Sequence, residues 1–459
     1  MLSRSKRVDD CSPSAACFGA GFPRLFPGFP KFPKGCASSR LSHLPGGHRI
    51  FRIAKLVKGR RGSLMDREKT AVITTGSFVM PSGRSSSLER VIENVVPLAA
   101  EHVKIRIFGL ADGHLPSQGW IGNVPVYRLP GGRLYLESIL RHLRKWRPGT
   151  VDVHNRPLLA FQLKSRLPLA RVLLTLHSAA FISPSCHPKA RMQPMLESVD
   201  GIIVGSEYLK EELLSRFPGL FTPIWVNPPG VTLEDFVPRW TPHGEVLRTA
   251  RLAEYGWENR KVALFVGRLL PAKGVHHLLA AFPAVLRQVP EAMLLIVGDT
   301  CHGANRETDY VSRLKAMAEP FKERVVFLPF TPYSKVADWY NTADCLVVPS
   351  CEEEAFGLVN VEAMASAVPI VAARAGSIPE IVADGYSGFL VPAEGIVNAL
   401  ADRVIRLLQD EALCKSMGQA GQELARSRFR WQHTAERWVD TICSSRVIPA
   451  NAPQWKQQP

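Results

Sequence analysis

The sequence predicts an α/β protein of two domains, each built around a parallel sheet, and three observations lead to this prediction. The chain has 459 residues, which is more than one hydrophobic core usually supports. From residue 71 onwards, short apolar runs alternate with segments of helical periodicity, a pattern typical of parallel α/β layers. This alternation restarts at Lys261, after a stretch interrupted by prolines. We therefore expect two similar domains that face each other across a cleft.

The first domain is expected over residues 66–238. Its strands are predicted where apolar runs have strand length, and its helices where apolar residues recur every three or four positions. The predicted strands are 71–75, 104–108, 124–128, 151–154, 172–177, 201–204 and 224–227. The predicted helices are 86–100, 134–145, 158–164, 192–198 and 206–217.

The second domain is expected over residues 261–428, after a linker at 239–260 that contains Pro242 and Gly244. Its predicted strands are 261–266, 293–297, 325–328, 344–348 and 369–373. Its predicted helices are 274–288, 309–318, 333–341, 358–367, 379–383, 398–408 and 411–426. Residues 429–445 hold a last helix with Trp431 and Trp438 at helical spacing, and 446–459 form a tail.

The net charge of +16 is concentrated in the N-terminal segment. Residues 1–65 hold 13 Lys or Arg against only Asp9 and Asp10, and the segment is rich in Gly, Pro and Phe. We interpret it as a disordered or non-native extension, with Met65 as an alternative start. Its Arg-rich, acid-poor composition leaves a transit peptide open as the other interpretation. Because the remaining chain carries little excess charge, nucleic-acid binding is not expected.

Cysteine usage and hydropathy favour a cytoplasmic location. The nine cysteines are scattered, odd in number and without a Cys-x-x-Cys pair, which fits reduced thiols. The longest apolar runs have strand length and fall well short of the roughly 18 residues that a membrane span needs.

The most informative stretch is residues 345–392. An apolar strand ends at Ser350, an acidic loop leads to Ala355-Phe356-Gly357, and a helix is expected from Leu358. A helix N-terminus offers free N–H groups and partial positive charge to a phosphate. The carboxylates of Glu354 and Glu362, with seven residues between them, can each accept two hydrogen bonds from the vicinal hydroxyls of a ribose or sugar. Phosphate, ribose and sugar together describe a nucleotide sugar.

A second stretch, Phe265 to Gly274, places two cations between a strand and a helix. Arg268 and Lys273 lie five residues apart after Gly267. They can stabilise the negative charge that develops on a leaving nucleoside diphosphate. The pattern lacks the lysine and hydroxyl spacing of a Walker loop. The alternative interpretation is a surface pair of basic side chains.

These two stretches resemble the family 4 retaining glycosyltransferases. The resemblance rests on the Glu–seven residues–Glu element with the following AGSIPE run, and it extends over about residues 68–443. The segments HNRP, LHS and GSEYLKEEL resemble the spore-coat SA-type and exopolysaccharide enzymes of bacteria. The resemblance implies the GT-B fold, in which two Rossmann-like domains face each other across a cleft and the C-terminal helix crosses back onto the first domain.

The resemblance also implies roles for residues of the second domain. Glu362 would bind the nucleotide ribose. Glu354, with the amides of Phe356, Gly357 and Leu358, would hold the sugar and phosphate. Gly267, Arg268 and Lys273 would approach the diphosphate, and the backbone of Phe330 would read an edge of the base. The catalytic set implied in this way is His177, Arg268, Lys273 and Glu354.

The first domain offers fewer specific residues. Gly83 lies between the first strand and helix, where related enzymes often carry a pair of glycines that contacts the donor diphosphate or the acceptor, although an ordinary helix cap explains this segment equally well. His177 follows a strand and would face the donor sugar; a structural histidine is the alternative. His154, Asn155 and Arg156 follow the preceding strand and are candidates for contact with the acceptor.

The expected substrates are a nucleoside-diphosphate sugar and a glycan, lipid-linked or small-molecule acceptor, with no tightly bound cofactor and no metal site. We interpret the basic helix with Arg133, Arg141 and Arg144 as a solvated helix face, with peripheral contact with the inner face of a membrane as the alternative. A spore coat is the other location that the resemblance suggests. Two further functions remain open: a coat or assembly protein that keeps the fold without turnover, and an epimerase or phosphorylase on the same fold.

Overall fold

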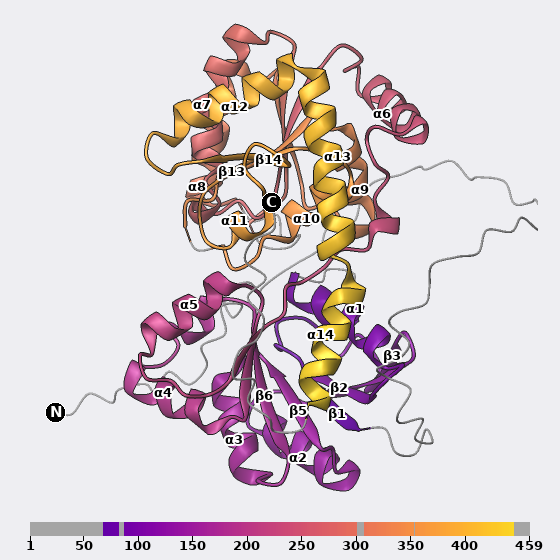
Figure 1. Cartoon of the computed structure of the whole chain (residues 1–459), viewed down its shortest axis with the longest axis vertical. Helices are drawn as coiled ribbons and strands as arrows, with labels where there is room; N and C mark the ends of the chain where they lie inside the picture. The colour runs from indigo at the N-terminus through magenta and orange to yellow at the C-terminus, as the bar shows by residue number, and fades with distance from the viewer. Residues whose placement is uncertain (1–67, 82–86, 301–306, 353, 445–459) are drawn as a thin grey trace, which may run out of the picture. The chain divides into compact units, whose positions relative to one another are not determined.

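The computed structural model describes residues 68–444 apart from 82–86, 301–306 and 353. The described residues belong to one compact unit, which contains two parallel sheets (Figure 1). The predicted extension at 1–65, the tail at 446–459 and the candidate Gly83 lie outside the described residues.

The first sheet has eight strands in the order β3-β4-β2-β1-β5-β6-β7-β8. All neighbours are parallel except β3, which pairs antiparallel with β4. The strands are β1 (Lys69–Ile73), β2 (Lys104–Leu110), β3 (Gln118–Ile121), β4 (Val124–Leu129), β5 (Thr150–His154), β6 (Arg171–Leu176), β7 (Gly201–Val204) and β8 (Ile224–Val226). The strand order reverses between β1 and β5, and in open parallel sheets ligands bind beyond the carboxyl ends of the strands at such a point.

Helices cover both faces of this sheet because successive side chains of a strand point to opposite faces. Ala71 and Ile73 pack in the apolar cluster formed with α2, α3, α4 and α5, whereas Val72 packs in the cluster that includes α1 and α14. The helices are α1 (Ser87–Ala99), α2 (Leu134–Trp146), α3 (Pro157–Arg166), α4 (Lys189–Ser198), α5 (Glu207–Arg216) and α14 (Trp431–Cys443).

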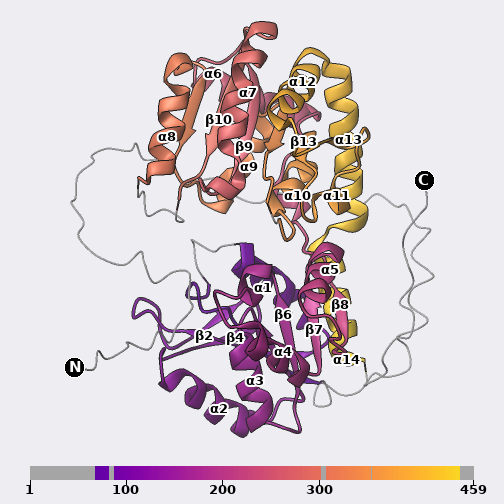
Figure 2. The ribbon, with the colours of Figure 1, turned by 90° about the vertical axis from the view of Figure 1, so that its left-hand side faces the viewer.

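The second sheet is wholly parallel, with the order β11-β10-β9-β12-β13-β14, and its order reverses between β9 and β12. Helices lie on both of its faces (Figure 2). The strands are β9 (Lys261–Val266), β10 (Ala292–Val297), β11 (Val325–Leu328), β12 (Cys345–Val348), β13 (Ile370–Ala373) and β14 (Gly388–Val391). The helices are α6 (Pro242–Glu254), α7 (Val275–Gln288), α8 (Asp309–Ala318), α9 (Tyr333–Thr342), α10 (Leu358–Ala365), α11 (Ile378–Ile381), α12 (Ile396–Gln409) and α13 (Glu411–Arg428).

The segment predicted as a linker at 239–260 contains a helix, α6. The side chain of Thr241 caps this helix by accepting a hydrogen bond from the Gly244 amide at 3.1 Å, and Pro242 occupies the first turn. Arg248 of α6 forms a bidentate ion pair with the buried Asp344, with both distances 2.9 Å. Helix α6 is therefore held to the second domain by a buried charge pair.

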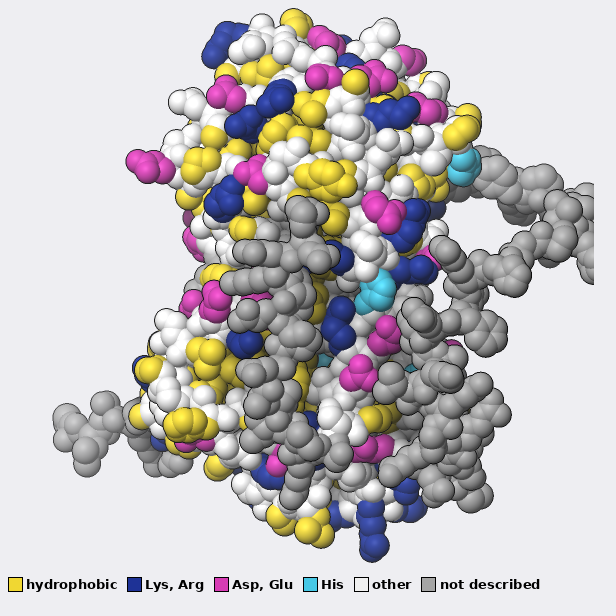
Figure 3. Space-filling view, in the orientation of Figure 1, with side chains coloured by type: hydrophobic (Ala, Val, Ile, Leu, Met, Phe, Trp, Pro, Cys, Tyr) yellow, Lys and Arg dark blue, Asp and Glu magenta, His cyan; other side chains and the backbone are white. Residues whose placement is uncertain are grey.

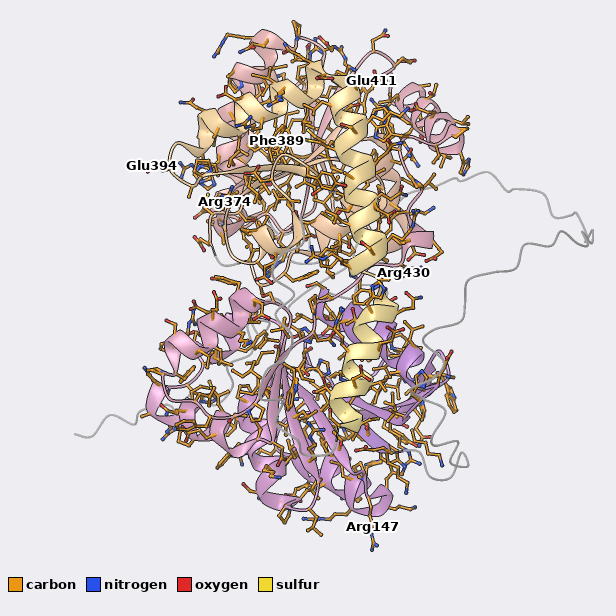
Figure 4. All side chains as sticks on the ribbon, in the orientation of Figure 1. Arg147, Arg374, Phe389, Glu394, Glu411 and Arg430 are labelled. Atoms are coloured by element: carbon orange, nitrogen blue, oxygen red, sulfur yellow. The ribbon has the colours of Figure 1, made fainter. Side chains whose placement is uncertain are left out.

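The last helix, α14, packs against α1 of the first domain, although it follows the second domain in sequence. Figure 4 marks Arg430, which lies where α13 ends and α14 begins. The Thr434 hydroxyl donates to the Pro228 carbonyl at 2.8 Å, and Arg171 of β6 donates to the carbonyl of Thr441 at 2.7 Å. The C-terminal helix therefore packs against the first domain.

Candidate active site

A cavity of about 450 Å³ lies at the carboxyl ends of the strands of the second sheet, a volume within the range of ligand pockets. Its walls come from the ends of β9 and β10, the loop after β11, α9, and α10 of the second domain. Helix α1 of the first domain contributes the remaining wall. The polar and glycine residues of the lining include Ser87, Arg90, Glu93, Asn94, Gly267, Arg268, Gly298, Asp299, Thr331, Ser334 and Glu362. The cavity therefore occupies the place where nucleotides bind in folds of this architecture.

Glu362 lies at the inner end of this cavity with both carboxylate oxygens in contact with donors. Its Oε1 forms an ion pair with Arg90 Nη1 at 2.8 Å, and its Oε2 accepts a hydrogen bond from the Tyr340 hydroxyl at 2.7 Å. Glu362 is 3% exposed and Tyr340 is fully buried. Because a carboxylate has about four lone-pair positions, Glu362 can still accept hydrogen bonds from a ribose.

Arg90 supplies a cation to the cavity from the first domain. Its guanidinium lies 4.1 Å from the centroid of the Tyr333 ring and pairs with Glu362. Burial is the largest single influence and acts to lower the pKa of Arg90, but the neighbouring Glu362 carboxylate, together with Tyr333 and Tyr340, outweighs burial and raises this pKa. Burial and the same carboxylate raise the pKa of Tyr340 well above its usual value. This corner therefore holds a charged pair and a neutral phenol.

Lys273 and Glu354 form a second ion pair beside the helix that begins at Leu358. Lys273 Nζ lies 2.5 Å from Glu354 Oε2, and the side chains are 25% and 14% exposed. Lys273 ends a short 3₁₀ turn, and Gly274, which follows in the left-handed conformation, immediately precedes α7. Arg268 lines the large cavity and is exposed. The two predicted cations therefore lie near each other in sequence but in different surroundings.

The loop that carries Glu354 is fixed by the chain that follows β13. The Ser377 amide and hydroxyl donate to the Glu354 carbonyl at 2.9 and 3.1 Å. Gly376 has φ of +55°, and a Cβ at this residue would lie 2.3 Å from the Glu354 carbonyl oxygen. Only a glycine fits there, because the left-handed backbone and the close approach each exclude a side chain.

We expect Gly376→Ala to displace Glu354 and break its contact with Lys273, so that catalytic activity falls by at least tenfold, the size of one lost charge-assisted hydrogen bond of about 1.5 kcal/mol. The matched control is Gly385→Ala. Gly385 also has a positive φ, of +76°, but no heavy atom lies within 4 Å of its added Cβ. Activity and melting temperature should be measured for both; equal losses of activity would contradict the steric explanation.

The AGSIPE run also ties the two domains together. Glu380 accepts hydrogen bonds from the amides of Glu207 and Tyr208, at 2.9 and 2.7 Å, at the N-terminus of α5. The Ser206 hydroxyl donates to the Ala355 carbonyl at 2.7 Å. A carboxylate at a helix N-terminus is favoured by the free N–H groups and the helix dipole. The last residue of the motif thus has a structural contact that the sequence alone does not reveal.

The two candidate histidines contact each other in the first domain. His154 Nδ1 lies 2.9 Å from His177 Nε2, and the two rings line a small cavity of about 30 Å³ beneath α1 and α14. Neither histidine lines the large cavity. Burial is the main cause that lowers the pKa of His177 to about 3, and His154 lowers it further. His177 is therefore neutral at neutral pH.

Asn155 and Arg156 follow β5 on the same edge of the sheet. Asn155 has φ of +55°, a conformation that Asn tolerates better than most residues, and its Oδ1 accepts a hydrogen bond from the His177 amide at 2.8 Å. The Arg156 guanidinium lies 4.7 Å from the centroid of the Tyr135 ring. Within the described part of the chain, Arg156 Nη1 is buried without a hydrogen-bond partner.

The structure brings some of the predicted residues together and separates others. Four line the large cavity: Gly267, Arg268, Phe330 and Glu362. Lys273, Glu354 and Gly357 cluster at the start of α10, where Phe356 is buried and Leu358 begins the helix. The sequence did not single out Arg90, Tyr333 or Tyr340, whose only sequence signal is a basic or aromatic side chain within a helix. Among the described residues, no group of three His, Cys, Asp or Glu side chains could hold a metal ion.

A nucleotide-sized cavity at the reversal point of the second of two parallel sheets, with cations and a carboxylate at its edge, defines a glycosyltransferase of the GT-B fold. The family model for glycosyl transferases group 1 matches residues 249–424, and the model for glycosyltransferase family 4 matches residues 88–235. The chain belongs to family 4 of the glycosyltransferases and is of the spore-coat SA type.

Three known proteins illustrate this similarity. Spore coat protein SA of Bacillus subtilis is 30% identical over 378 residues, which cover 82% of this chain and 100% of that protein. Sucrose-phosphate synthase from Thermosynechococcus elongatus has a TM-score of 0.67 at 24% identity, covering 82% of this chain and 98% of that one. Anabaena Alr3699/HepE, solved in complex with UDP, has a TM-score of 0.65 at 20% identity, covering 82% and 99%. The two solved structures show the fold.

Proposed function

We propose that the protein is a retaining hexosyltransferase of polysaccharide biosynthesis. It moves a sugar from a nucleoside-diphosphate sugar to a glycan, lipid-linked or small-molecule acceptor. The single observation that carries the proposal is the cavity of about 450 Å³ lined by Arg268, Phe330 and Glu362. Anabaena HepE, which shares the fold, has been solved with UDP and with UDP-glucose, so a uridine nucleotide is the first donor to test.

The side chains around the cavity match the parts of such a donor. Glu362 accepts hydrogen bonds from the ribose, and the loop at Phe330 to Pro332 borders the base. Arg268, Lys273 and the amides at the start of α10 hold the diphosphate. Cleavage of the sugar–phosphate bond places negative charge on the leaving diphosphate, and fixed cations stabilise that charge as it develops. No resident cofactor is needed for this chemistry.

The acceptor enters from the side of the first domain in this proposal. His154, Asn155 and Arg156 lie at the carboxyl end of β5, next to the point where the strand order reverses. The unpartnered buried nitrogen of Arg156, noted above, supports a polar ligand at this edge, because buried donors usually have partners. Asn155 fixes the backbone amide of His177. In this proposal the His177 side chain contacts the donor sugar across the cleft.

The proposal is tested by a thermal-shift panel of nucleoside diphosphates and their sugars on the full chain. A ligand that binds only the folded protein raises the melting temperature, and the stabilisation is about 2.7 kcal/mol when the ligand is present at 100 times its Kd. We expect one diphosphate family to stabilise the protein and the matching sugar nucleotide to be consumed when an acceptor extract is added. Stabilisation without turnover would support an assembly protein that retains the fold, and no stabilisation would contradict the proposed donor site.

We also propose that the protein works in the cytoplasm, in peripheral contact with the inner face of a membrane. Helix α2 buries Tyr135, Ile139 and Leu143 and exposes a row of basic side chains that ends at Arg147 (Figure 4). No helix among the described residues has the length and apolarity to cross a membrane. Sedimentation with anionic vesicles, lost when Arg141, Arg144 and Lys145 are changed to Gln, tests the contact; binding that survives the changes would contradict it.

Charged side chains of both signs are interspersed on the visible face of the second domain (Figure 3). This face offers no continuous basic track of the kind that follows a nucleic-acid backbone. The surface is consistent with small-molecule and glycan substrates.

A further inference from the structure

A chain of polar contacts runs from the C-terminal helix to His177. Trp438 Nε1 of α14 donates a hydrogen bond to Asp152 Oδ2 at 2.8 Å. The same oxygen of Asp152 lies 3.3 Å from His154 Nε2, and His154 Nδ1 lies 2.9 Å from His177 Nε2. Four side chains from α14, β5 and the end of β6 thus form a continuous series of contacts. None of these four side chains lines the large cavity.

Asp152 is the charged centre of this chain. It is fully buried, and its Oδ1 accepts a hydrogen bond from the Thr175 hydroxyl at 2.6 Å. Burial alone would raise the pKa of Asp152, but His154 and the hydrogen bonds from Thr175 and Trp438 together lower it. Asp152 is therefore an ionised carboxylate at neutral pH and can only accept hydrogen bonds.

We propose that Asp152 and Trp438 are positioning residues that set the tautomer and orientation of His177 through His154. A carboxylate favours an N–H on the facing Nε2 of His154. In the neutral ring Nδ1 then has a lone pair and accepts a hydrogen bond. The Nε2–H of His177 is the donor to that lone pair, which leaves His177 Nδ1 as an acceptor. The side-chain Oδ1 of Asn155 fixes the His177 amide independently.

The role of Trp438 follows from the geometry of Asp152 Oδ2. This oxygen faces both the indole N–H and His154, so the indole fixes the position of the carboxylate that orients the imidazole. Trp438 is 4% exposed and lies on a helix that returns from the second domain. Docking of α14 on the first domain therefore completes the environment of His177. This inference rests on the proposed function only where it assigns His177 a part in sugar transfer.

The test compares two tryptophans of the same helix in the full-length protein. Trp438→Phe removes the N–H that Asp152 accepts. Trp431→Phe makes the same chemical change at a tryptophan that is also 4% exposed and whose Nε1 has no partner among the described residues. Nitrogen-15 spectra of histidine-labelled protein report which ring nitrogen of each imidazole carries the proton, and His177→Asn assigns the His177 signals.

We expect His177 to be protonated on Nε2 in the wild-type protein and in Trp431→Phe, and to become a mixture of tautomers in Trp438→Phe. Hydrolysis or transfer of the stabilising sugar nucleotide should fall roughly tenfold in Trp438→Phe, equivalent to about 1.4 kcal/mol on the barrier, with KM for the donor unchanged. A merely structural role would lower the melting temperature without moving the tautomer signals.

The outcomes separate this inference from the proposed function. Unchanged His177 signals in Trp438→Phe would overturn the inference even if the protein transfers sugar. Altered signals with unchanged turnover would leave the positioning established but would remove His177 from the reaction. Because Asp152→Asn risks misfolding of the first domain, Trp438→Phe is the primary variant, and donor-induced thermal stabilisation confirms that it is folded.

Discussion

Lys273→Met is expected to lower kcat for sugar transfer by roughly two to three orders of magnitude, the usual cost of removing one fixed group that stabilises transition-state charge. The side chain is held 2.5 Å from Glu354 and is only 25% exposed, so its ammonium is in place before the reaction begins. The charge on the diphosphate increases as the sugar bond breaks. The lost interaction is therefore stronger in the transition state than in the bound donor, and kcat falls more than donor affinity.

Two controls sharpen this prediction. Lys273→Arg keeps the charge but changes its geometry, so we expect an intermediate rate. Lys315→Met removes an exposed lysine of the same domain that pairs with Glu307 on the surface, with side chains 52% and 54% exposed, and it should leave kcat unchanged. Rates are measured with saturating donor, and affinities by calorimetry with the nucleoside diphosphate. A Lys273→Met enzyme with unchanged kcat and weakened donor binding would assign this lysine to binding alone.

The parts of the fold that the sequence predicts are those with strong local signals. Strands such as β10 and β12 are continuous apolar runs buried on both faces, and they are predicted because buried parallel strands have this composition. Strand β3 lacks that signal, because it is an edge strand of four residues with an exposed Trp120. Strand β14 was missed although it is a fully buried run of four residues like β12. Helix α6 was missed although Thr241 and Pro242 are a recognisable start signal.

The residues of the candidate site likewise fall into those with a local sequence signal and those without one. Lys273, Arg268, Glu354 and Glu362 lie in two continuous stretches, so the order of residues along the chain already indicates their neighbours. Contacts made by tertiary packing carry no such local signal. Trp438 and Asp152 are 286 residues apart, and helical periodicity alone predicts Trp438 as a core residue. Arg90 likewise reaches Glu362 from another domain.

Glu362→Ala is expected to weaken binding of the nucleoside diphosphate by about 10- to 100-fold, because hydrogen bonds to a charged group contribute about 1.5–3 kcal/mol. It should also destabilise the protein by about 3 kcal/mol, since it leaves the largely buried Arg90 without its counter-ion. These two effects have different origins and can be separated. Affinity is measured by calorimetry, and stability by urea unfolding.

The Arg90→Met variant separates the effect on nucleotide affinity from the effect on stability, because it removes the buried cation while leaving Glu362 with the hydrogen bond from Tyr340. In the Arg90→Met background, Glu362→Ala no longer leaves a guanidinium unpaired, so its cost in stability should be much smaller. Its cost in nucleotide affinity should persist, because the ribose contacts the carboxylate and not the guanidinium. If the affinity loss also disappears in the double variant, Glu362 acts on the donor only by holding Arg90, and the cation from the first domain is the group that binds the nucleotide.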